Sequence, residues 1–216
     1  MHVMITGVAG FIGYHIAHKL LKSGISVTGV DNLNSYYDVK LKNARLKLLS
    51  DLSKNQNTMF DFYEGDIVDN NLITDIFKKK SFDKVIHLAA QVSVPISIHS
   101  FKESSKSNIL SSINTVDFCR TYNIPLVYAS SSSVYGGADN LPTTEADLKK
   151  PKSPYAWQKS VIEDYAKLCG SLYDLDIVCM RYFNVFGERS PTRGQYAPVI
   201  GIFQRQKLAG EPLTIV

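Results

Sequence analysis

The sequence predicts an α/β protein in which a parallel sheet carries helices on both faces. Short apolar runs rich in β-branched residues recur along the chain, and stretches with helical spacing of apolar residues separate them. The first apolar run leads directly into three glycines spaced three apart, and a helical pattern follows at once. The chain has 216 residues, of which 44% are hydrophobic, so it can bury one substantial core. Strands that alternate with helices are typical of a doubly wound parallel sheet.

The glycines Gly7, Gly10 and Gly13 follow the first strand and open the first helix, expected over 11–23 with Gly24 as its C-cap. Gly7 favours a sharp turn with positive φ, because it has no Cβ. Gly10 lets backbone N–H groups approach a pyrophosphate at the positive end of the helix. Gly13 lets the helix pack closely on the strand. Glycines also form ordinary tight turns, but strand, turn and helix occur here in the order that a dinucleotide site requires.

A second strand, 26–30, ends at Asp31, which lies 18 residues beyond Gly13. A carboxylate at this position accepts hydrogen bonds from the adenosine ribose hydroxyls and repels a 2′-phosphate. The sequence therefore predicts NAD rather than NADP as cofactor. The alternative is that Asp31 is an ordinary loop acid.

The later elements alternate in the same way. We expect helices over 39–49, 70–79, 101–122 and 155–168, and strands over 58–64, 85–88, 126–130 and 176–181. Ligands of such sheets bind beyond the carboxyl ends of the strands. This rule selects the residues that could carry chemistry, namely 7–12, Asp31, 66–67, 88–91, 130–133 and 182–184.

Two of these features could act on a sugar hydroxyl. Ser130 to Ser133 follow the fifth strand, and hydroxyls there can both donate and accept hydrogen bonds, although a serine-rich turn is the alternative. Tyr155 and Lys159 lie four apart on a predicted helix, so they share one face, and the cation should lower the pKa of the phenol. Tyr36 and Lys40 have the same spacing. Only the Tyr155 pair follows a serine-bearing strand end and opens a helix, after Pro154.

Composition excludes other classes of function. The net charge is +4 and the basic runs are short, so we expect no nucleic-acid partner. Cys119, Cys169 and Cys179 show no disulfide spacing, which indicates a cytoplasmic protein. No apolar run is long enough to cross a membrane. His15 and His18 could share a helix face, but no further ligand converges on them in the sequence, so we expect no metal site.

Seven motifs occur in the order typical of one family. They are Gly7-x-x-Gly10-x-x-Gly13, 31–34, 65–67, 87–91, 130–132, 153–159 and 181–184. Over nearly its whole length the chain resembles an extended short-chain dehydrogenase/reductase of the nucleotide-sugar epimerase/dehydratase kind. The resemblance implies a Rossmann fold and NAD as cofactor. It also implies that Tyr155 is the catalytic acid/base, that Lys159 tunes its pKa and holds the nicotinamide ribose, and that Ser131 binds the reacting sugar oxygen.

The expected site follows from the motifs and this resemblance together. The expected cofactor contacts are Gly7, Gly10, Phe11, Ile12, Gly13, Asp31, Asn32, Asn34, Ser35, Asp66, Ile67, Leu88, Ala89, Ala90, Gln91, Asn108, Tyr155, Lys159 and Phe183. The expected substrate contacts are Ser131, Ser132, Ser133, Tyr155 and Asn184, of which Asn184 stands where the family holds the substrate diphosphate.

Within that family the sequence favours 4-epimerisation of a UDP-sugar. The related dehydratases carry an Asp-Glu pair after the catalytic hydroxyl, and this chain has Ser132 and Ser133 there. Residues 31–42 resemble UDP-glucuronate 4-epimerases, whereas 91–95, 181–187 and 194–200 resemble UDP-N-acetylglucosamine or UDP-glucose epimerases, so the sugar stays open. The alternatives are a sugar-nucleotide dehydratase or reductase, and a truncated NAD-binding protein without turnover.

The resemblance also predicts the organisation of the chain. Residues 1–184 should form the NAD-binding domain with the catalytic Tyr and Lys, and 185–216 the incomplete start of a smaller substrate-binding domain. Residues 211–215 look like its first strand, and members of the family continue well beyond Val216. A homodimer through the helices at 101–122 and 155–168 is expected on the same basis.

Overall fold

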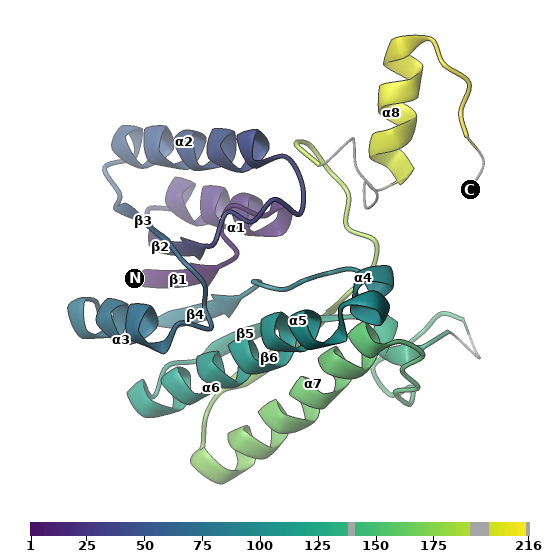
Figure 1. Ribbon diagram of the computed structural model, residues 1–216. Coiled ribbons are helices and arrows are strands. Elements are labelled where there is room, and N and C mark those ends of the chain that lie inside the picture. Colours follow the sequence, from purple (N-terminus) through teal and green to yellow (C-terminus); the bar gives the residue numbers. More distant parts are fainter. Residues whose placement is uncertain (138–140, 191–198, 215–216) are drawn as a thin grey trace.

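The computed structural model describes residues 1–137, 141–190 and 199–214. Six parallel strands form one sheet in the order β3-β2-β1-β4-β5-β6 (Figure 1). Their bounds are β1 His2–Thr6, β2 Ser26–Asp31, β3 Phe60–Glu64, β4 Lys84–His87, β5 Leu126–Ser131 and β6 Ile177–Tyr182. The strand order reverses between β1 and β4, where parallel sheets of this kind bind their ligands. The predicted doubly wound parallel sheet is therefore confirmed.

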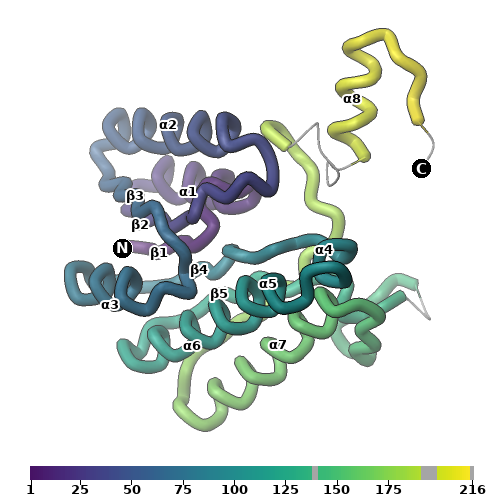
Figure 2. The backbone as a smooth tube through the Cα atoms, in the orientation of Figure 1, coloured from purple at the N-terminus to yellow at the C-terminus, as the bar shows by residue number. Residues whose placement is uncertain are grey.

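Helices cover the two faces of this sheet (Figures 1 and 2). One face carries α1 Phe11–Lys22 and α2 Val39–Asn55. The other carries α3 Asn70–Lys79, α6 Ser111–Tyr122 and α7 Pro154–Tyr173. The shorter elements are α4 Val94–His99, α5 Phe101–Ser105, the π-helix η1 Lys106–Leu110, the 3-10 helix η2 Ser132–Tyr135 and, after β6, α8 Val199–Ala209.

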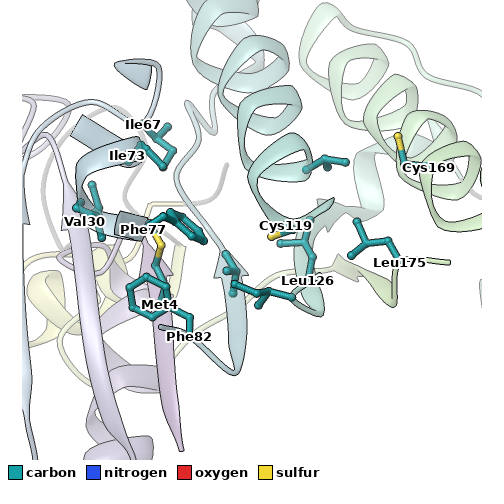
Figure 3. Close-up of a cluster of buried hydrophobic side chains, with 14 residues drawn as sticks. Met4, Val30, Ile67, Ile73, Phe77, Phe82, Cys119, Leu126, Cys169 and Leu175 are labelled. Carbon is teal, nitrogen blue, oxygen red and sulfur yellow. The ribbon is translucent and has the colours of Figure 1, made fainter. Parts of the chain in front are cut away.

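The central strands bury both of their faces. Along β1, Val3 and Ile5 pack with α1 and α2, whereas Met4 between them packs against α3 on the opposite face. Figure 3 shows the second of these clusters, in which Met4, Phe77 and Phe82 gather beside Cys119 and Leu126. This double burial is the reason why the strands read as continuous apolar runs rather than as alternating ones.

Some elements differ from the sequence prediction. The single helix expected over 101–122 contains a π-helical turn at Lys106–Leu110, and a short helix, α4, precedes it where none was expected. Helix α2 continues to Asn55 rather than ending near residue 49. The strand expected at 211–215 is absent from its described part, 211–214, which pairs with no strand of the described sheet; Gln206 of α8 makes two hydrogen bonds with Thr214.

Within the described ranges, no helix is both long enough and apolar enough to cross a membrane.

Candidate active site

The turn between β1 and α1 is closed so tightly that side chains cannot enter it. Gly7 has a φ of +71°, and a Cβ there would lie 2.9 Å from the backbone nitrogen of Ala89. A Cβ on Gly13 would lie only 2.2 Å from the carbonyl oxygen of Gly7. Gly10 precedes α1 without any side-chain cap, so the first N–H groups of the helix remain available to an anion. The three glycines thus have the geometry that the sequence predicted.

Asp31 ends β2 beside this turn, and its carboxylate is held in place by the backbone. Oδ2 accepts a hydrogen bond from Ala9 N (3.1 Å), and Oδ1 accepts one from Leu33 N (2.9 Å). Lys42 Nζ lies 3.5 Å from Oδ1 and donates to Asn34 Oδ1 at 3.0 Å. Burial lowers the pKa of Lys42 although the neighbouring carboxylate raises it. Asp31 is thereby fixed as an acceptor at the edge of the cavity described below.

Arg45 of α2 stabilises the turn between β1 and α1 and the segment that follows Asp31. Its buried guanidinium donates to Ala9 O (2.9 Å), to the Tyr37 hydroxyl (2.6 Å) and to Arg189 O (2.7 Å). Arg45 therefore ties the segment after β6 to the β1–α1 turn, although 144 residues separate Arg45 from Arg189. His15 Nε2 makes a second such contact, at 2.8 Å from Glu188 O.

Tyr155 lies in the first turn of α7, where a proline and two hydrogen bonds fix the start of the helix. Pro154 occupies the first helical position, Ser153 caps Ala156 N (3.1 Å), and Ser97 Oγ accepts from Tyr155 N (3.0 Å). The phenol is 7% exposed and hydrogen-bonds Ser131 at the end of β5. Burial raises the pKa of Tyr155, and the bond to Ser131 opposes that shift.

Lys159 lies one turn further along α7 and is fully buried. Its Nζ donates to Ala129 O (2.8 Å) and lies 4.8 Å from the centre of the Tyr128 ring. Burial lowers its pKa to about 8. The sequence predicted that this cation lowers the pKa of Tyr155, but the pKa is raised. The ammonium is directed to a carbonyl of β5, and removal of the phenol from water outweighs the opposing bond from Ser131.

Glu163, one turn beyond Lys159, connects α7 to the ends of β5 and β6. It accepts hydrogen bonds from Ser130 Oγ and from the guanidinium of Arg181 (2.8 Å to Oε2). Arg181 in turn donates to the Tyr135 hydroxyl at 2.8 Å. Burial raises the pKa of Glu163, but the hydrogen bonds from Arg181 and Ser130 outweigh it, so the net pKa is lowered. This ion pair fixes the strand end that carries Ser131.

The glycine turn, Asp31, Ser131, Tyr155 and Lys159 line one cavity with a volume of about 400 Å³. Its wall includes most of the predicted residues, namely Gly7, Gly10, Phe11, Ile12, Gly13, Asp31, Asn32, Asn34, Asp66, Ile67, Leu88, Ala89, Ala90, Gln91, Ser131, Tyr155, Lys159 and Phe183. The predicted residues Ser35, Asn108, Ser132, Ser133 and Asn184 do not line it. Asn108 is buried and hydrogen-bonds the backbone of Gln91, so its effect on the cavity is indirect.

Sequence reasoning missed several residues of this region. Lys42 and Tyr37 line the cavity beside Asp31, and Arg45 supports them. The sequence does contain a pattern that could have identified them. Lys42 and Arg45 lie three apart on the helix that follows Asp31, so both cations lie on one face of that helix. Glu163 offered a comparable signal, because it continues the four-residue spacing of Tyr155 and Lys159 along α7.

Comparisons with known proteins agree with this geometry. A family model for the NAD dependent epimerase/dehydratase family matches residues 3–216. UDP-glucuronate 4-epimerase of Thermodesulfobacterium geofontis (strain OPF15) is 41% identical over 189 residues, which are 86% of this chain and 56% of that relative.

Two solved structures are similar in fold. UDP-glucose 4-epimerase from Thermotoga maritima, with UDP-glucose, matches with a TM-score of 0.84 at 34% identity, covering 98% of this chain and 64% of that one. UDP-glucuronic acid 4-epimerase from Bacillus cereus, in complex with UDP-glucuronic acid and NAD, matches with a TM-score of 0.82 at 30% identity, covering 100% and 65%. The chain spans about half the length of the curated relatives it matches.

Proposed function

Because the chain belongs to the NAD-dependent epimerase/dehydratase family, we propose that it carries the cofactor site and the proton-transfer residues of a UDP-sugar 4-epimerase. The observation that supports this most is the position of Tyr155 and its hydrogen-bond partner Ser131. Both line the cavity that also contains the glycine turn and Asp31. A proton-transfer group thus faces the space in which a dinucleotide would bind.

The residues present fit NAD. The turn is closed to any Cβ at Gly7 and Gly13, which leaves the backbone of the α1 N-terminus bare for a pyrophosphate. Asp31 would accept the adenosine ribose hydroxyls, and Lys159 would contact the nicotinamide ribose. Bound NAD supplies reversible hydride transfer at C4 of the sugar. The other predicted contacts, including Ser35 and Asn108, remain part of this proposal.

The chain's own residues would manage the proton of the C4 hydroxyl. Tyr155 would exchange that proton through its phenol oxygen, and Ser131 would hydrogen-bond the same sugar oxygen. Burial raises the pKa of Tyr155 in the cofactor-free protein, which favours the protonated phenol. The hydrogen bond with Ser131 opposes this shift and so favours the phenolate. Glu163, through Ser130 and Arg181, would hold Ser131 at the reacting oxygen.

The sugar is proposed at the level of a UDP-hexose: UDP-glucose, UDP-N-acetylglucosamine or UDP-glucuronate. The names of the similar proteins include all three kinds of epimerase. We assign cofactor binding and acid/base chemistry to 1–184, and the start of the substrate-binding part to 185–216. Ser132, Ser133 and Asn184 are proposed to contact the substrate.

A homodimer in the cytoplasm is also proposed. Exposed apolar side chains on the helices α5 to α7 support the dimer, in particular Phe101 (50% exposed), Trp157 (46%) and Leu172 (64%). The three free cysteines, two of them buried, support a reducing compartment.

The test is to incubate the purified chain with NAD and with each of the three UDP-sugars, and to separate the C4 epimers by chromatography. Interconversion of one pair is the expected result and identifies the sugar. A 4-keto-6-deoxy product would instead indicate a dehydratase. Binding of NAD without any product would reduce the function of this chain to cofactor binding.

A further inference from the structure

Gln158 lies between Tyr155 and Lys159 on α7, yet it does not line the cavity. Its side chain is fully buried, and Oε1 accepts hydrogen bonds from Asn108 Nδ2 (2.7 Å) and Ser104 Oγ (2.9 Å). Nε2 donates to Ser104 Oγ (2.7 Å) and Ser105 Oγ (3.1 Å). Both ends of the amide are therefore used inside the protein. Because a buried amide is costly unless it is fully paired, its position here is strongly specified.

Asn108 links Gln158 to the loop 89–91, which lines the cavity. It lies in the π-helix η1, Lys106–Leu110, and its Oδ1 accepts from Gln91 N (2.8 Å) while Nδ2 donates to Gln91 O (3.1 Å). The side chain of Asn108 thus pairs with both the backbone N–H and the backbone C=O of Gln91. Nδ2 has two N–H groups, of which Gln158 takes the second. Gln158 therefore stabilises the same orientation of the Asn108 amide that pairs with Gln91.

Gln91 belongs to the wall of the cavity, together with Ala89 and Ala90. Ala89 also packs against Gly7, at a backbone distance that leaves no room for a Cβ. The side-chain Oε1 of Gln91 is buried and has no hydrogen-bond partner among the described residues. The loop therefore touches the glycine turn and presents an unsatisfied acceptor, so a small shift of Gln91 would change the shape of the cofactor site.

We propose that Gln158 is a positioning residue, which fixes the loop 89–91 relative to α7 by holding Asn108 in place. The Gln158–Asn108–Gln91 connection joins the helix that carries Tyr155 to the wall against which the cofactor would lie. It sets the separation between the proton-transfer group and the cofactor. The effect on the cofactor rests on the proposed function. The hydrogen-exchange test of the Gln91 amide does not.

The test substitutes Gln158→Met, which keeps the length and burial of the side chain but cannot accept from Asn108. Hydrogen exchange of the Gln91 amide, followed by NMR, should become at least tenfold faster, because Asn108 Oδ1 is its acceptor. The dissociation constant of NADH, measured by its fluorescence, should rise at least fivefold. Ser105→Ala is the matched control: it removes one bond at Nε2 and leaves the Asn108 contact. It should change both values less than twofold.

A second variant keeps the proposal testable if Gln158→Met folds poorly. Gln158→Glu retains an oxygen that can accept from Asn108, so the Gln91 amide should exchange within threefold of wild type. Equal exchange of Gln91 in wild type and Gln158→Met would overturn the proposal. So would equally fast exchange in Gln158→Met and Ser105→Ala, since that result indicates general loosening. Failure of the wild-type chain to bind NADH would instead contradict the proposed function and leave the exchange comparison valid.

Discussion

Gly13→Ala tests the closed turn at the start of α1. The added Cβ would lie 2.2 Å from Gly7 O, 2.9 Å from Val8 Cα and 3.0 Å from Gly7 C. Non-bonded carbon contacts are normally about 3.5–4.0 Å, so the helix must move by about 1 Å away from the turn. All three neighbours are backbone atoms, and no side-chain rotation can relieve the overlap. The substitution therefore acts on the geometry that the pyrophosphate would meet.

The magnitude follows from two opposing effects of the added methyl group. Overpacking costs about 1–3 kcal/mol, while alanine in a helix gains up to about 1 kcal/mol over glycine. The expected net loss is about 1–2 kcal/mol of unfolding free energy. For a chain of this size, each 1 kcal/mol lowers Tm by about 2–4 °C. We expect Tm to fall by about 2–8 °C and NAD affinity to fall by at least about tenfold, which corresponds to 1.4 kcal/mol.

The assay is thermal unfolding followed by circular dichroism, with and without NAD. NAD should raise Tm of the wild type in a concentration-dependent way and have a much smaller effect on Gly13→Ala. Gly24→Ala is the matched control, because Gly24 has a φ of +77° but no atom within 4 Å of a Cβ. It should lose stability through backbone strain and still respond to NAD. Wild-type Tm and wild-type NAD affinity in Gly13→Ala would show that the turn has room for a Cβ and is not closed as described.

Three further substitutions test the chemistry of the site. Tyr155→Phe should lower turnover by about 10²–10⁴-fold and spare NAD binding, since only a proton carrier is lost; steady-state kinetics and calorimetry measure the two effects. Asp31→Ala should reduce the preference for NAD over NADP, which competitive binding of the two cofactors measures. Lys159→Met should change the pH dependence of stability. Burial lowers the pKa of Lys159 from 10.5 to about 8, so between those values the unfolded chain binds more protons, and the wild type gains stability as pH rises. Relative to Lys159→Met, its unfolding free energy should increase by up to about 1.4 kcal/mol per pH unit, measured in urea at pH 8, 9 and 10.

Each of these expectations has a contradicting result. Turnover that survives in Tyr155→Phe would remove that residue from the acid/base role. Unchanged selectivity in Asp31→Ala would mean that another residue, such as Lys42, reads the ribose. Parallel stability curves for wild type and Lys159→Met would show that the ammonium is not desolvated.

The fold was predictable from local patterns, because each strand here is a short apolar run and most helices carry apolar residues at helical spacing. The order of the strands was not, since adjacency of β1 and β4 depends on contacts between distant segments. The π-helix at Lys106–Leu110 also escaped prediction. Asn108 is placed there by its pairing with Gln91 and Gln158, which no local periodicity records.

The candidate site was predicted better in its positions than in its energetics. Motif spacing located Tyr155, Lys159 and Asp31, and all three line one cavity. The spacing could not show that Lys159 donates to Ala129 O, or that burial raises the pKa of Tyr155. Such shifts depend on how much water the fold removes, which is a property of the packed structure.

In the proposed function, hydride leaves C4 of a UDP-sugar and returns to it within one site. The most direct measurement uses the wild-type chain with NAD and a C4-deuterated UDP-sugar in ordinary water, followed by mass spectrometry of the epimer formed. The label should remain at C4 in the product, because the hydrogen never exchanges with solvent. An epimer that has lost the deuterium to water would contradict the claim, since its C4 hydrogen would then have left as a proton.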